Sequence, residues 1–182
     1  MTAPVVVGLD GSGRSLRALR WAAHEASLRG APLQLVHVIT VSELSFPYSR
    51  HEAAEDRGRE ILGEARRLTG EAHPDVEITA EMPSGSAAEV VLDKSDRAAL
   101  IVLGAKGHDL GDTMLGSVAL QVVGHARCPG VIVGHVPAGH RGAVVGTDCS
   151  PEAQAALEFA FGEAAMRGGG PACVIGGGGR AG

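Results

Sequence analysis

Short apolar runs alternate with amphipathic helical stretches along most of this 182-residue chain, and this alternation restricts the fold more than any other feature. The runs are rich in Val, Ile and Leu and lie at residues 5–7, 33–38, 76–80, 99–103 and 131–133. Between them, apolar residues recur at the helical period, as in Leu16, Leu19, Ala23 and Ala26. Apolar strands that alternate with such helices form parallel sheets, because right-handed crossovers place helices on both faces. The sequence therefore predicts an α/β fold with a doubly wound sheet of five strands.

The chain also contains an internal repeat. Residues 6–30 return at 144–168 without a gap, and 12 of the 25 aligned positions are identical. A duplicated domain explains this repeat. In the second copy Ser150 precedes Pro151, which is typical of a helix that begins with a serine cap and a proline in its first turn. The equivalent Ser12 is therefore predicted to cap the first helix.

A second helix start is predicted at Ser86. Glu89 follows three residues later, and this spacing is typical of a capping box, in which each side chain accepts a hydrogen bond from the other residue's backbone. The spacing predicts a helix over residues 86–95.

The repeat sets the domain organisation that we expect. Residues 1–137 would form a complete domain, whereas 141–182 would form an incomplete second repeat with its first strand, its first helix and part of a second strand. About 40 residues bury too little surface to fold alone. We therefore expect this segment to dock on the first domain, to pair with another chain or to stay partly disordered.

Composition argues against several classes of protein. Twenty-one acidic and 16 basic residues give a net charge of −5, so neither nucleic acid nor an anionic membrane is an expected partner. No targeting segment is visible and no run of about 18 apolar residues occurs, so we expect a cytoplasmic protein. Three cysteines without a C-x-x-C pair and eight histidines without H-x-x-x-H spacing predict no metal site. Arg14, Arg17 and Arg20 share a helical spacing and are predicted to form a solvated face.

Two loops have chemistry that suits a ligand at the carboxyl ends of the strands. In the first, Asp10, Gly11 and Ser12 follow the first strand, and the carboxylate could accept hydrogen bonds from a ribose or a base. An Asp-Gly turn that bonds only its own backbone explains the same residues. In the second loop, residues 104–117, glycines would let backbone N–H groups approach a phosphate at the start of a helix, or would simply form turns. The residues themselves leave both pairs of interpretations open.

Six strings are informative in combination: VVVGLDGS, WAAHEASLRGAPLQLVHV, GSAAEVVL, LIVLGAKG, LGSVALQVV and CPGVIV. Taken together, they resemble the universal stress protein family. It implies a Rossmann-like sheet in the strand order 3-2-1-4-5. ATP-binding members carry G-x2-G-x9-G-[ST] after the fourth strand, and here the corresponding string, from Gly104 through Gly107 to Gly116 and Ser117, is one residue shorter.

The resemblance also implies a binding site and a mode of assembly. It places Asp10 at the ribose or adenine side and Val38 in the adenine pocket, with Gly11 and Ser12 in the same loop. The predicted phosphate contacts are Gly104, Gly107, Gly116, Ser117 and Val118. Asp109 and Asp112 add negative charge beside the phosphates unless a divalent cation bridges them. A homodimer through the last strand, Val131, Ile132 and Val133, is the expected assembly.

The sequence thus predicts a regulatory protein that binds ATP, with Mg²⁺ as a possible companion, and at most slow hydrolysis. No catalytic arrangement can be identified from spacing. The main alternative is a dimerising scaffold of the same family that has lost the nucleotide. A phosphotransfer enzyme is a third hypothesis, which turnover abolished by Asp10→Ala would support.

Overall fold

The computed structural model describes residues 2–40, 48–105, 116–134, 144–147, 150–168 and 172–175. The chain divides into two compact units, Met1–His135 and Val136–Gly182. The domain limits expected from the repeat, 1–137 and 141–182, stay predictions. Within the described ranges, no helix has the length and apolar character needed to cross a bilayer.

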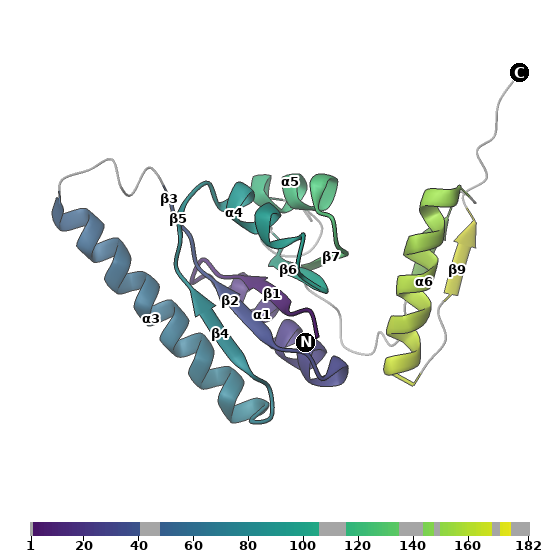
Figure 1. Ribbon diagram of the computed structural model, residues 1–182, viewed down its shortest axis with the longest axis horizontal. Coiled ribbons are helices and arrows are strands. Elements are labelled where there is room, and N and C mark those ends of the chain that lie inside the picture. The colour runs from purple at the N-terminus through teal and green to yellow at the C-terminus, as the bar shows by residue number, and fades with distance from the viewer. Residues whose placement is uncertain are drawn as a thin grey trace, which may run out of the picture. The chain divides into compact units, whose positions relative to one another are not determined.

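The first unit contains a parallel sheet of five strands (Figure 1). They are β1 (Val5–Gly8), β2 (Leu33–Val36), β4 (Ile78–Glu81), β6 (Leu100–Gly104) and β7 (Gly130–Val133). Their spatial order is β4-β2-β1-β6-β7, which is the predicted order 3-2-1-4-5. The prediction of a Rossmann-like sheet is therefore confirmed. Beyond it, β3 (Ile39–Thr40) and β5 (Ser84–Gly85) form a short parallel pair.

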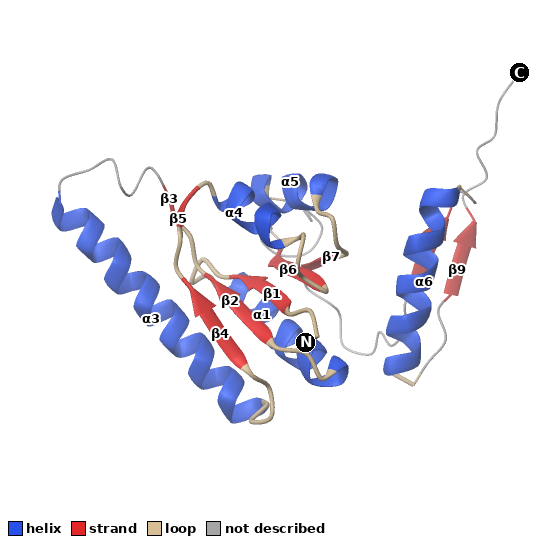
Figure 2. Ribbon diagram, viewed as in Figure 1, coloured by secondary structure: helices blue, strands red, loops and turns tan. Residues whose placement is uncertain are grey.

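Helices cover both faces of this sheet (Figure 2). The helices α1 (Gly13–Arg29) and α3 (Tyr48–Ala72) contact each other on one face. The helices α4 (Ala87–Lys94) and α5 (Ser117–His125) contact each other on the opposite face. The sheet is thus buried between two helical layers, as continuous apolar strands require.

Side chains along each strand alternate between the two layers. Val6, Val36 and Ile101 pack with Val91 of α4 and Val122 of α5 in one buried cluster. The residues that alternate with them are also fully buried, among them Val5, Val7, Leu35 and Val102. Each such side chain stabilises the fold by about 1.5–3 kcal/mol. This core fixes the positions at which β1, β2 and β6 end.

The first helix begins as its sequence predicts. The Ser12 hydroxyl accepts a hydrogen bond from the Ser15 N–H at 3.2 Å, so the predicted serine cap is confirmed. The helix ends at Gly30, whose φ of 56° lies in the left-handed region that glycine adopts without a steric penalty.

The predicted capping box at α4 is wrong. Ser86 does occupy the cap position, but its side chain makes no capping hydrogen bond, and Glu89 is exposed. The backbone explains the difference, because ψ is 122° at Ser86 but 158° at Ser12, where the hydroxyl does reach the first turn. The exposed Ser86 hydroxyl is open to water instead.

The second unit contains two strands and one helix within the described residues. The strands β8 (Val144–Thr147) and β9 (Ala172–Ile175) pair in parallel, and α6 (Pro151–Met166) connects them. The Ser150 hydroxyl accepts from the Ala153 N–H at 3.2 Å, which confirms the cap predicted there. The repeat therefore extends from the sequence to the local structure of both helix starts.

Candidate functional site

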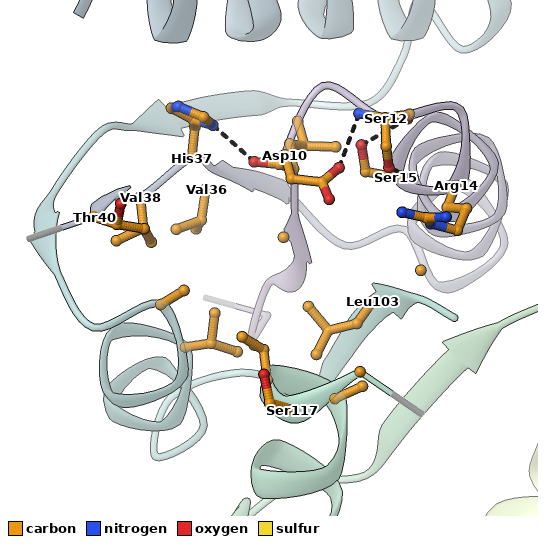
Figure 3. A pocket seen from close by; sticks show the side chains of 18 of the residues that line it. Asp10, Ser12, Arg14, Ser15, Val36, His37, Val38, Thr40, Leu103 and Ser117 are labelled. Carbon is orange, nitrogen blue, oxygen red and sulfur yellow. Dashed lines mark hydrogen bonds between the residues drawn. The ribbon is translucent and has the colours of Figure 1, made fainter. Parts of the chain in front are cut away.

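A cavity of about 440 Å³ lies in the first unit beyond the carboxyl ends of β1, β2 and β6 (Figure 3). The connections from β1 and β6 lead to opposite sides of the sheet, so this is the point where the strand order reverses. Ligands of open α/β sheets bind at such points. The cavity volume lies within the range of small-molecule sites, roughly 300–1,000 Å³.

The turn after β1 forms one wall of the cavity. Asp10 and Ser12 line it, and Asp10 Oδ1 accepts a hydrogen bond from the Ser12 N–H at 2.9 Å. The local turn expected for an Asp-Gly pair is therefore present, and the same carboxylate also faces the cavity. Gly11 does not line the cavity; its φ of 77° makes the turn, and a Cβ there would lie 2.8 Å from Ile61 Cδ1.

The surroundings of Asp10 favour its charged form. Partial burial acts to raise the pKa of this carboxyl, but hydrogen bonds from Ser12 and Ser15 and the positive charge of Arg14 act against it and lower the pKa overall. Asp10 is thus an anion at neutral pH. It can accept hydrogen bonds from a ligand's hydroxyl or amino groups.

A histidine ties the β1 turn to the end of β2. His37 lies beside the cavity, and its Nδ1 is 2.8 Å from the Leu9 carbonyl oxygen, which can only accept, so Nδ1 carries the proton. The chain of α3 passes close to this ring, since a Cβ at Gly58 would lie 2.8 Å from His37 Cδ2. The helix α3 therefore packs against the histidine that bonds to the turn.

The part of the cavity next to β2 is apolar. Val36 and Val38 line it from β2 and the residues that follow, and Val91 lines it from α4. Figure 3 shows Val36, Val38 and Thr40 on the side opposite Arg14. The predicted pocket residue Val38 is thus part of an apolar wall that suits a flat ring.

The end of β6 is packed against the start of α1. A Cβ at Gly104 would lie 2.9 Å from both the carbonyl carbon and the carbonyl oxygen of Arg14. Only glycine permits this approach of two backbones, and the approach is independent of any ligand. Gly104 also lines the cavity, so its predicted phosphate contact stays a prediction beside this structural role.

The start of α5 forms the remaining polar wall. Gly116, Ser117 and Val118 line the cavity, and Gly116 offers no side chain to cap the helix. The first intrahelical bond runs from the Leu120 N–H to the Gly116 carbonyl, so the N–H groups of residues 117–119 have no acceptor within the helix. These donors and the helix dipole favour an anion. Gly107, Asp109 and Asp112 lie outside the described residues.

Two cationic cavity residues, Arg14 and Arg57, were not predicted as part of the site. Arg14 was expected on a solvated face with Arg17 and Arg20; those two are exposed, but Arg14 points to the cavity. Arg57 comes from α3, whose position over the β2 end no local pattern reveals. Among the described residues, no group of three metal-ligating side chains occurs.

The fold and the crevice define a Rossmann-like α/β domain with an open site at the reversal of strand order. The family model of the universal stress protein family matches residues 1–134. A universal stress protein of Mycolicibacterium smegmatis is 34% identical over 178 residues, which cover 90% of this chain and 60% of that protein. The chain belongs to the universal stress protein family. It spans about three fifths of the length of the curated relatives that it matches.

Solved structures support the same assignment. The universal stress protein from Archaeoglobus fulgidus in complex with dAMP is 27% identical, with a TM-score of 0.57, and the match covers 72% of this chain and 97% of that one. A universal stress protein in complex with cAMP is 26% identical with the same coverage of this chain and a TM-score of 0.57. Another from A. fulgidus reaches a TM-score of 0.81 over 94% of this chain and 66% of that chain, and at 21% identity it shows the fold alone.

Proposed function

We propose that the cavity at the carboxyl ends of β1, β2 and β6 binds an adenine nucleotide, and that the chain acts as a nucleotide-responsive regulatory protein in stress. One observation carries this proposal: a single cavity joins an apolar wall to the uncapped start of α5. The first suits an adenine ring, and the second suits a phosphate.

Named residues would hold each part of the ligand. The base would pack against Val38, and the ionised Asp10 would accept hydrogen bonds from the ribose or the base. The phosphates would bind the N–H groups of Ser117 and Val118. Gly104, Gly107 and Gly116 would keep the backbone accessible. The relatives solved with dAMP and cAMP support an adenine nucleotide as the ligand class.

Within that class we propose ATP, with Mg²⁺ as its companion. The cation would offset the charge that the triphosphate brings close to Asp10. The proposed activity is ATP binding, and ATP hydrolysis would be slow at most. Such a protein would respond to whether its nucleotide site is occupied.

Isothermal titration calorimetry of the full chain tests this function. We expect saturable binding of ATP with a Kd on the order of micromolar, tighter with Mg²⁺ than without it. Asp10→Ala should weaken binding, whereas Asp93→Ala, which changes an exposed carboxylate outside the cavity, should not. If neither AMP nor ATP gives a saturable heat of binding, with or without Mg²⁺, the proposal is refuted.

A second candidate function, a dimerising scaffold, is favoured by the edge of the sheet. The strand β7 pairs with β6 only, so one side of Val131, Ile132 and Val133 is free to pair within the described sheet. Leu120 and Val123 of the adjacent α5 are 60% and 51% exposed. We expect a homodimer in sedimentation equilibrium that Val123→Lys weakens; a monomer at high concentration would contradict this assembly.

A further inference from the structure

Arg14 occupies an unusual position for a cation. It is the second residue of α1, and its side chain lines the cavity on the side next to Leu103 (Figure 3). The N-terminus of a helix carries partial positive charge, so a cation there is unfavourable. The first turn of α1 contains no acidic residue, and the carboxylate that senses the charge of Arg14 is Asp10 in the preceding turn.

The guanidinium of Arg14 also has no ion-pair partner among the described residues. No carboxylate of the described ranges lies within 4.0 Å of it. The nearby Asp10 uses Oδ1 for the Ser12 N–H. Arg29, at the other end of α1, is a clear contrast: it lies where the dipole favours a cation, and its Nε is 2.5 Å from Glu25 Oε1.

The two polar walls of the cavity differ in how many backbone N–H groups lack a hydrogen-bond acceptor. At the start of α1, Ser12 and Asp10 already accept backbone N–H groups. At the start of α5, the N–H groups of residues 117–119 lack acceptors within the helix. An anion in the cavity would therefore lie at α5 rather than at α1. A positive side chain from α1 would complete its surroundings.

The packing of β6 against α1 fixes the backbone position of Arg14. The backbone of Arg14 contacts Gly104, and Gly104 ends the strand from which the chain continues toward α5. The backbone of Arg14 is thus held beside the part of the cavity that the start of α5 lines. The apolar wall of Val36 and Val38 lies on the other side.

We propose that Arg14 binds the phosphate of the nucleotide and makes the site selective for phosphorylated nucleotides over the nucleoside. This inference rests on the proposed nucleotide function. The guanidinium offers several donors and a permanent charge to phosphate oxygens, but nothing that an uncharged adenosine could use in the same way.

Calorimetry with ATP and adenosine tests this role in the wild type, Arg14→Ala and Arg17→Ala. Arg17 is the matched control, an exposed arginine of the same helix that does not line the cavity. We expect Arg14→Ala to weaken ATP binding by about 10- to 100-fold and to leave adenosine binding unchanged. Arg17→Ala should change neither. The ligand-free melting temperature of Arg14→Ala should change little, because the unfavourable position of the cation at the helix N-terminus and its attraction to Asp10 are removed together.

Two results would overturn the inference alone: ATP binding by Arg14→Ala as tight as the wild type's, or an equal loss of affinity for ATP and adenosine. A wild-type chain that binds neither ligand would refute the proposed function and this inference together. A much lower ligand-free melting temperature in Arg14→Ala, together with weaker adenosine binding, would show a structural role and would also overturn it.

Discussion

The contact between Gly104 and the backbone of Arg14 gives a prediction that separates packing from ligand binding. In Gly104→Ala the new Cβ would lie 2.9 Å from two backbone atoms of Arg14, and real Cβ atoms essentially never come that close. Because backbone atoms cannot rotate away, β6 and α1 must separate. Overpacking of this kind costs about 1–3 kcal/mol. For a unit of this size the melting temperature should fall by about 3–10 °C.

A second glycine provides the matched control. Gly63 lies in the middle of α3, and a Cβ there meets nothing within 4 Å. Gly63→Ala should therefore stabilise the protein by about 0.5–1 kcal/mol, through helix propensity alone. Both variants are measured without ligand by circular dichroism during heating. A Gly104→Ala protein as stable as the wild type would refute the reasoning and would return Gly104 to a purely ligand-binding role.

Three further predictions follow from local contacts. Ser12→Ala should cost about 1 kcal/mol in urea denaturation, and Ser86→Ala, whose hydroxyl caps nothing, much less; equal losses would contradict this. The pKa of Asp10 lies below its ordinary 3.8, so its charge stabilises the fold above pH 3.8 and that stability is lost as pH falls through the lowered value. Asp10→Asn should flatten the acid limb of the pH–stability curve, and an unchanged limb would contradict the shift. Arg29→Ala removes the cation that pairs with the fully buried Glu25 and should lower the free energy of unfolding by about 3 kcal/mol in urea denaturation. A loss below about 1 kcal/mol would contradict this, because it would show that Glu25 does not depend on Arg29.

The fold could be predicted because its strands and helices have strong local patterns. The five apolar runs became the five strands within one or two residues. Ser150 before Pro151 predicted one helix cap, and the repeat extended this prediction to Ser12. The strand order came from the family resemblance, since apolar patterning does not distinguish one order of buried parallel strands from another. Ser86 shows that residue spacing alone does not predict a capping box. Its spacing to Glu89 fits the motif, but the backbone at Ser86 does not bring its hydroxyl to the first turn of the helix.

The candidate site could be predicted only in part. The turn at Asp10 and the glycines follow strands, so sequence position alone places them at one edge of the sheet. Arg14 shares its spacing with two exposed arginines, and only the contact of α1 with β6 shows that it differs from them. His37 reaches the cavity because it directly follows β2. Arg57 reaches the cavity because α3 packs beside β2, and such long-range packing has no local signature.

A crystal structure of the chain with ATP and Mg²⁺ tests the central claim most directly. We predict adenine against Val38 and a phosphate oxygen at about 3 Å from the Val118 nitrogen, with the Arg14 guanidinium on the same phosphate group. An ATP molecule ordered elsewhere on the protein, or a crevice without nucleotide at saturating ATP, would contradict the account.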